Sequence, residues 1–68
     1  MPKYIVNQNA QNNGDHEFHK AGCAHMPVPT NCYDLGEHRN CQDAVTAAKR
    51  IYRQSNGCYY CCNECHTQ

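Results

Sequence analysis

The sequence predicts a small α+β domain in which one amphipathic helix packs on a short antiparallel sheet of two or three strands. Three observations support this fold class. The chain has 68 residues, the size of one domain, so we treat residues 1–68 as a single unit. Short β-branched and aromatic segments near its start are typical of strands. A later segment carries apolar residues at the spacing of a helix.

Two strands are predicted near the N-terminus. Residues 4–6 are Tyr-Ile-Val, a β-branched and aromatic segment that favours a short strand. A polar run that ends in Asn-Gly-Asp follows and indicates an irregular turn. If residues 16–19 are extended, His16 and Phe18 lie on one face and His19 lies on the other. We therefore expect a hairpin between these two segments.

The middle of the chain offers little regular structure, because Pro27 and Pro29 interrupt any element that would cross them. Residues 33–35, which are Tyr-Asp-Leu, favour a third short strand before Gly36. The predicted sheet therefore has two strands, or three if this segment joins it.

The clearest element is a helix predicted over residues 42–54. Asn40 is a good N-cap, and Asp43 three residues later makes a partial capping box. Five apolar residues form one stripe that we expect to face the core: Ala44, Val45, Ala48, Ile51 and Tyr52. Three cations gather in the last turns, where positive charge suits the helix dipole: Lys49, Arg50 and Arg53. Asn56 or Gly57 is expected to take a left-handed cap that ends the helix.

The composition indicates that this fold needs support beyond its apolar core. Leu, Ile, Val and Phe together number only seven, whereas the chain has seven Cys and five His. A domain this short, with so few large apolar residues, normally requires disulfides, a metal or a partner to be stable. The odd cysteine count, the bunching at one end and the adjacent pair Cys61 and Cys62 do not suit a framework of paired disulfides.

The expected setting also favours a metal over disulfides. The N-terminal segment turns polar at Asn7 before any apolar region of a signal peptide develops. No stretch is apolar enough to span a membrane. We therefore expect a cytoplasmic, reducing location, where clustered Cys and His are more often metal ligands than disulfide partners.

Two pairs of residues are the candidate metal ligands. Cys58 and Cys61 form a Cys-x-x-Cys motif, which places two thiolates on one tight turn at about 2.3 Å from a shared zinc ion. Far upstream, His19 and Cys23 form a looser His-x-x-x-Cys pair. Together they predict a Zn²⁺ site that staples the two ends of the chain.

Other residues offer alternative ligands, and the sequence leaves them open. The alternates are His16, Cys62, Cys65 and His66. Cys62 and Cys65 are themselves a Cys-x-x-Cys pair, which can replace a chosen ligand or bind a second ion. Cys41 is expected to be a buried apolar residue at the start of the helix, with a reactive thiol as the alternative because thiol pKa values fall there. Cys32 has no assigned role. Burial as a small apolar residue is also the alternative reading of Cys58 and Cys61.

Four protein ligands leave no open position for water or substrate, so we expect a structural zinc-binding domain that is no enzyme. Its expected role is an interaction module that is monomeric, binds a protein partner and does not contact membranes. One alternative is a thiol redox or metal-relay protein using the C-terminal cysteines. The motif at Cys58 and Cys61, however, follows a helix C-terminus, whose field does not stabilise a thiolate. A nucleic-acid-binding module is the other alternative, although zero net charge gives no basic footprint.

Several short segments also carry a resemblance to known proteins: Tyr4-Ile5-Val6-Asn7, Gly14-Asp15-His16-Glu17-Phe18-His19-Lys20, Leu35-Gly36, Asp43-Ala44-Val45 and Gly57-Cys58-Tyr59-Tyr60-Cys61. In these the chain resembles a family of small bacterial proteins rich in Cys and His, a likeness that implies no particular activity.

A more distant resemblance covers roughly residues 19–61. His19 and Cys23, a helix with an Ala-rich start, and then Cys58 and Cys61 occur in the order found in the metal-binding module of the Ada DNA-repair regulator. This resemblance implies zinc and a small α+β fold. The Ada position that accepts a methyl group corresponds to His19, which cannot accept one in that way, and the Pro that tends to follow the Ada Cys-x-x-Cys is missing. Methyl transfer and DNA repair are therefore not carried over.

Overall fold

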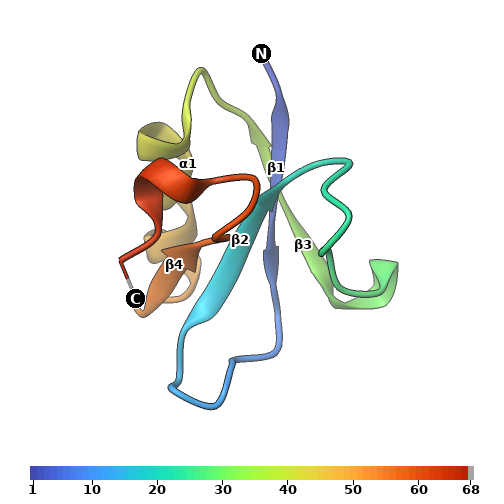
Figure 1. The fold of residues 1–68 in the computed structure, drawn as a ribbon, viewed down its shortest axis with the longest axis vertical. Helices are drawn as coiled ribbons and strands as arrows, with labels where there is room; N and C mark the ends of the chain where they lie inside the picture. Colours follow the sequence, from blue (N-terminus) through green and yellow to red (C-terminus); the bar gives the residue numbers. More distant parts are fainter. Residues whose placement is uncertain (68) are drawn as a thin grey trace.

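The computed structural model describes residues 1–67, which form one α-helix and a four-stranded sheet (Figure 1). The strands lie in the order β3-β1-β2-β4. Their bounds are β1 Lys3–Asn7, β2 His16–Lys20, β3 Cys32–Glu37 and β4 Ser55–Gly57. The helix α1 spans Cys41–Ile51, and short 3₁₀ turns span Pro29–Asn31 and Asn63–Cys65. The predicted α+β class is confirmed, with four strands in place of the two or three expected.

The register of the N-terminal hairpin determines which side chains lie on each face of the sheet. β1 and β2 pair antiparallel, with Ile5 opposite His19 and Val6 opposite Phe18. Because side chains alternate along a strand, Val6 and Phe18 share one face and Ile5 and His19 share the other. All four are buried. Both faces of this part of the sheet are therefore covered.

The fourth strand is the element that sequence reasoning missed. β4 follows the helix and pairs parallel with β2, with Phe18 opposite Gly57. The prediction of an entirely antiparallel sheet is therefore wrong. So is the predicted left-handed cap, because α1 ends at Ile51 and its C-cap Tyr52 has an extended backbone with φ −127°. Asn56 and Gly57, the residues expected to form the cap, instead lie in β4 and pair with β2.

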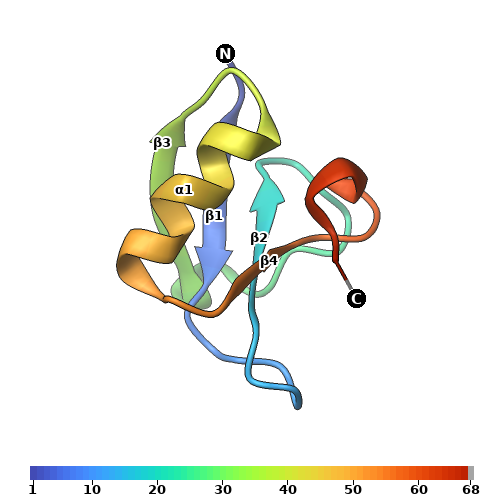
Figure 2. The ribbon, with the colours of Figure 1, turned by 90° about the vertical axis from the view of Figure 1, so that its left-hand side faces the viewer.

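The helix lies across one face of the sheet (Figure 2). Its N-cap is as predicted, since the Asn40 side chain accepts a hydrogen bond of 2.9 Å from the Asp43 backbone N–H. Its buried line comprises Cys41, Ala44 and Ala48, at i, i+3 and i+7. These small side chains let the helix sit close to the sheet, where the same cluster contains Tyr4, Val6 and Phe18.

The predicted apolar stripe is only partly correct. Ala44 and Ala48 are fully buried, and Val45 and Tyr52 pack against the core as partly buried residues. Ile51 is 39% exposed, so the prediction that it faces inward is wrong. It occupies the last helical position, three residues beyond Ala48, where the chain is about to leave the helix for β4.

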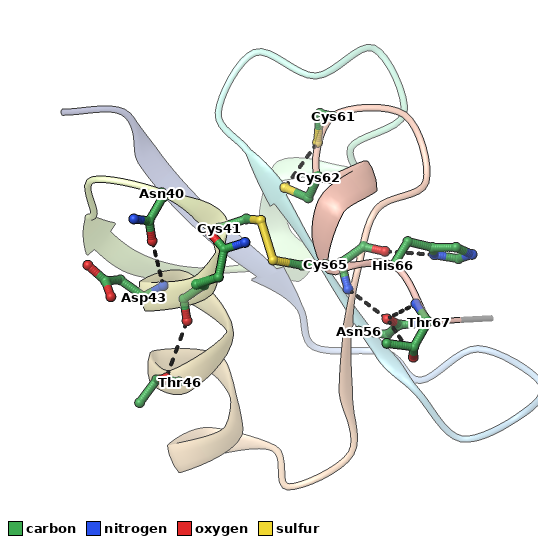
Figure 3. The surroundings of a disulfide bond; sticks show 12 residues. Asn40, Cys41, Asp43, Thr46, Asn56, Cys61, Cys62, Cys65, His66 and Thr67 are labelled. Carbon is green, nitrogen blue, oxygen red and sulfur yellow. Dashed lines mark hydrogen bonds between the residues drawn. A yellow bond between two sulfur atoms is a disulfide. The ribbon is translucent and has the colours of Figure 1, made fainter.

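A disulfide between Cys41 and Cys65 joins the first residue of α1 to the last residue of the C-terminal 3₁₀ turn (Figure 3). The Cα atoms of the two cysteines are 6.2 Å apart. Cys41 is buried, as expected, but its disulfide was not predicted. The disulfide holds the C-terminal segment against the start of the helix.

Gly57 is required for space and not for an unusual backbone angle. Its φ is not in the left-handed region, in contrast to Gly14, Gly22 and Gly36. A Cβ atom at Gly57 would lie 2.9 Å from the carbonyl oxygen of Cys62 and 3.0 Å from Cβ of Cys65. The C-terminal segment therefore packs directly on the backbone of β4.

Over residues 1–67, the single α-helix is too short and too polar to cross a membrane.

Candidate metal centre

Four side chains from two separate stretches of the chain converge near the ends of β2 and β4: His19, Cys23, Cys58 and Cys61. One potential ligand atom from each lies within 4.8 Å of all the others. This group can hold a metal ion, and it comprises the four residues that the sequence spacing singles out.

The pairing of β2 with β4 explains why the two halves meet. His19 lies on β2, and Cys23 lies in the loop that follows it. Cys58 comes directly after β4, and its backbone N–H donates a 2.9 Å hydrogen bond to the carbonyl oxygen of Phe18. This bond continues the parallel ladder and places Cys58 beside His19. The backbone N–H of Cys62 then donates to the carbonyl oxygen of Cys58, also at 2.9 Å, and closes the turn that carries Cys61.

The distance between two of the sulfurs fits a shared ion. The Sγ atoms of Cys23 and Cys58 are 3.9 Å apart. Two thiolates that bind one zinc ion at about 2.3 Å with a tetrahedral angle lie about 3.8 Å apart. These two side chains therefore need little rearrangement to bind the same ion.

His19 is the least satisfied polar residue of the site. Its side chain is fully buried, and neither ring nitrogen has a hydrogen-bond partner. Nε2 lies 3.3 Å from Oε1 of Glu17, but this contact lacks hydrogen-bond geometry. Buried polar groups of native proteins are almost always paired, because an unpaired one costs free energy. A metal ion would supply a partner for one of these two nitrogens.

Burial also favours the form of His19 that binds metals. It lowers the pKa of His19 against an opposing contribution from Glu17, and His25 lowers the pKa further. The imidazole is therefore neutral at neutral pH, and a neutral ring nitrogen is the ligand that metal ions require.

Backbone N–H groups point at the three sulfurs. Those of His25 and Tyr60 donate to the Sγ atoms of Cys23 and Cys58, each two residues earlier, and both bonds are 3.4 Å long. The N–H of Lys20 donates to Sγ of Cys61 at 3.3 Å. Donors aimed at sulfur stabilise a thiolate and orient it as a ligand.

The Cys61 thiol shows why these donors do not suffice without a cation. Burial raises the pKa of Cys61 far above its usual range. The N–H of Lys20 opposes this shift, whereas Cys23 and Cys62 add to it. Deprotonating the Cys61 thiol therefore calls for a positive charge beside it, which a bound metal ion would provide.

None of the four alternate ligands belongs to this group, and three of them have other contacts in the structure. His16 stacks on Tyr52, with ring centroids 3.8 Å apart, and its Nδ1 is 2.9 Å from the carbonyl oxygen of Asn7. His66 Nδ1 is 2.9 Å from the carbonyl oxygen of Gly57. Cys65 is in the disulfide and has no free thiol, so the proposal that it is a ligand is wrong for this state of the chain.

Cys62 is the one alternate that borders the site. Its Sγ lies 3.7 Å from Sγ of Cys61, and its side chain is buried in the core cluster. It does not belong to the group of four whose ligand atoms lie within 4.8 Å of one another. Cys32 lies elsewhere, with its Sγ 3.6 Å from the carbonyl oxygens of Pro27 and Val28.

No family model, curated protein or solved structure matches this chain, so the resemblance to the Ada module stays a prediction.

Lowering the pH should destabilise the fold through His19. Because its pKa in the folded chain is below the ordinary value of 6.5, the unfolded chain takes up the proton first. The contribution of His19 to the free energy of unfolding is therefore fully present above its ordinary pKa. It is lost as the pH falls from there towards the lowered pKa of the folded chain. A bound metal acts in the same direction, since protons compete with it for imidazole and thiolates. Thermal melts between about pH 7.5 and pH 5.5 measure this effect.

The matched control for this experiment is His38→Gln, which removes a histidine whose Nε2 contacts the carbonyl oxygen of Leu35 and which is not one of the four candidate ligands. The variant should keep the pH dependence of the melting temperature. A flat profile in the unaltered chain, or loss of the dependence in the control, would contradict the assignment to His19.

Proposed function

We propose that this chain is a structural zinc-binding domain in which one Zn²⁺, held by His19, Cys23, Cys58 and Cys61, stabilises the fold. The observation that carries the proposal is the buried, unpaired imidazole of His19 among three thiols. Burying such a group without a partner lowers the free energy of unfolding. A metal ion bound there would give the imidazole a partner and would stabilise the folded chain.

The donor set supports zinc and a structural role. Three sulfurs and one imidazole nitrogen are ligands typical of tetrahedral structural zinc sites. With all four positions taken by protein side chains, no position remains for water or substrate. Catalysis by the ion is therefore not part of the proposal.

The small core explains why the ion would matter so much. Its large side chains are few, and the helix contributes mainly alanines to it. A structural zinc in a small domain contributes about 10–16 kcal/mol in apparent binding free energy. The whole stability of an ordinary domain is about 5–15 kcal/mol. Metal binding would thus supply most of the folding free energy.

Exposed aromatic residues beside the site support a role as an interaction module. Tyr59 and Tyr60 lie on the ligand turn and are 56% and 67% exposed. The ring of Tyr60 stacks on His25, which is two residues from Cys23, with centroids 3.9 Å apart. Exposed tyrosines are enriched at protein interfaces. A metal ion that holds both loops would also fix this aromatic surface for a protein partner.

Native mass spectrometry of protein purified without added metal tests the proposal. We expect the mass of one zinc ion per chain, lost after incubation with a strong chelator. A chain that carries no metal under these conditions and stays folded would contradict the proposal. Two ions per chain would show that the surplus cysteines form a further site.

A further inference from the structure

The Cys41–Cys65 disulfide lies outside the proposed metal site but close to it in the chain. Cys65 is four residues after Cys61, at the end of the 3₁₀ turn that follows the ligand turn. The other partner, Cys41, is the first residue of α1. In Figure 3 the disulfide bridges the helix and the C-terminal segment, with Cys61 and Cys62 on that same segment.

Hydrogen bonds connect the disulfide to the ligand turn. The backbone N–H of Cys62 donates to the carbonyl oxygen of Cys58, and the N–H of Cys65 donates to that of Cys62, both at 2.9 Å. These two bonds close two successive turns, so the positions of Cys58, Cys62 and Cys65 are linked. The position of Cys65 and the conformation of the turn that carries Cys58 and Cys61 depend on each other.

A second set of contacts joins the same segment to β4. The backbone of Gly57 has no room for a side chain, because Cys62 and Cys65 pack against it. Next along the chain, His66 Nδ1 lies 2.9 Å from the carbonyl oxygen of Gly57. The Thr67 N–H donates to Oδ1 of buried Asn56 at 3.1 Å. The disulfide therefore holds in place a segment that supports the ligand turn from the side of β4.

The two cysteines of the disulfide differ in exposure, which decides where a small thiol would attack. Cys65 is only partly buried, whereas Cys41 is buried, so an incoming thiolate attacks Sγ of Cys65. A mixed disulfide forms, the bond between Cys41 and Cys65 breaks, and Cys41 leaves as a thiolate. A helix N-terminus stabilises negative charge, which favours this leaving group at the start of α1. A second thiolate releases Cys65 and forms the oxidised disulfide of the small thiol, and both protein thiolates take protons from water.

We propose that the Cys41–Cys65 pair is a redox site for low-molecular-weight thiols such as glutathione, and that its oxidised form increases the affinity of the chain for zinc. This inference rests on the proposed zinc site. Coupling between two sites is reciprocal, so bound zinc makes the disulfide harder to reduce by the same factor. We expect a factor of about ten, within the usual range of such couplings.

The test is a chelator competition that measures the zinc dissociation constant under anaerobic conditions. Three samples are compared: the oxidised chain, the chain reduced with a phosphine, and the double variant Cys41→Ser/Cys65→Ser. The reduced chain and the double variant should bind zinc about tenfold more weakly than the oxidised chain. In a glutathione redox buffer, zinc should lower the equilibrium constant for reduction of the disulfide by the same factor.

Two controls separate the coupling from other effects. Cys32→Ser removes a thiol that lies away from the site and should leave all values unchanged. The phosphine should not alter zinc binding by the double variant. Oxidised and reduced chains with equal zinc affinity would overturn the inference while leaving the zinc site intact. If neither form retained zinc, the proposed function itself would fail. Should the double variant not fold, the reduced chain still decides the outcome.

Discussion

The variant Cys58→Ser should retain no zinc and should lose its cooperative unfolding transition. The Cys58 side chain is buried, its Sγ lies 3.9 Å from that of Cys23, and the N–H of Tyr60 donates to it. A serine hydroxyl is a much poorer zinc ligand than a thiolate and is not deprotonated at neutral pH. Loss of the ion removes most of a contribution of about 10–16 kcal/mol. Zinc content and a thermal melt measure both effects.

Variants of the other cysteines make this prediction specific. Cys61→Ser should behave as Cys58→Ser does, because both sulfurs belong to the group of four. Cys32→Ser should leave zinc and stability unchanged. Cys62→Ser should weaken zinc retention modestly, since Cys62 only borders the site. If Cys62→Ser released the metal as completely as Cys61→Ser, our assignment of ligands on this turn would be wrong, although a zinc site could still exist.

The variant Ala48→Asp should strongly destabilise the domain even when zinc is present. Ala48 is fully buried in the cluster that contains Val6 and Phe18. An aspartate there places an unpaired charge among apolar side chains and overfills a tightly packed contact between helix and sheet. We expect a loss of at least about 4 kcal/mol in the free energy of unfolding, which is near the upper end for single substitutions. Urea denaturation of the zinc-loaded chain measures the loss.

Thr46→Asp is the matched control for this helix. It introduces the same charge two residues earlier, where the side chain is exposed. Surface substitutions of this kind change stability by about 0.5 kcal/mol or less. Equal losses for the two variants would show that α1 packs on the sheet by a different face.

The helix illustrates what the sequence allows one to predict. Its existence, its N-cap at Asn40 and the burial of Ala44 and Ala48 follow from local patterns, namely a capping side chain and apolar spacing. The exposure of Ile51 does not, because it depends on where the chain turns away to form β4. That strand is a Ser-Asn-Gly segment with no β-branched residue, so nothing in its composition indicates pairing with β2.

The site shows the same division between local and tertiary information. Spacing singles out the four residues that the fold brings together, because each ligand pair is local in sequence. Spacing does not reveal that His19 is fully buried, which depends on how the whole chain folds around it. Nor does it reveal the Cys41–Cys65 disulfide, whose partners are 24 residues apart and meet only after the helix has packed on the sheet.

The ligand set itself is open to direct measurement by X-ray absorption at the zinc edge of the metal-loaded chain. We expect three sulfurs at about 2.3 Å and one nitrogen at about 2.0–2.1 Å from the ion. The variant His19→Cys should change this shell to four sulfurs. Four sulfurs in the unaltered chain would mean that Cys62 has replaced His19, and a shell dominated by oxygen would contradict the proposed site as a whole.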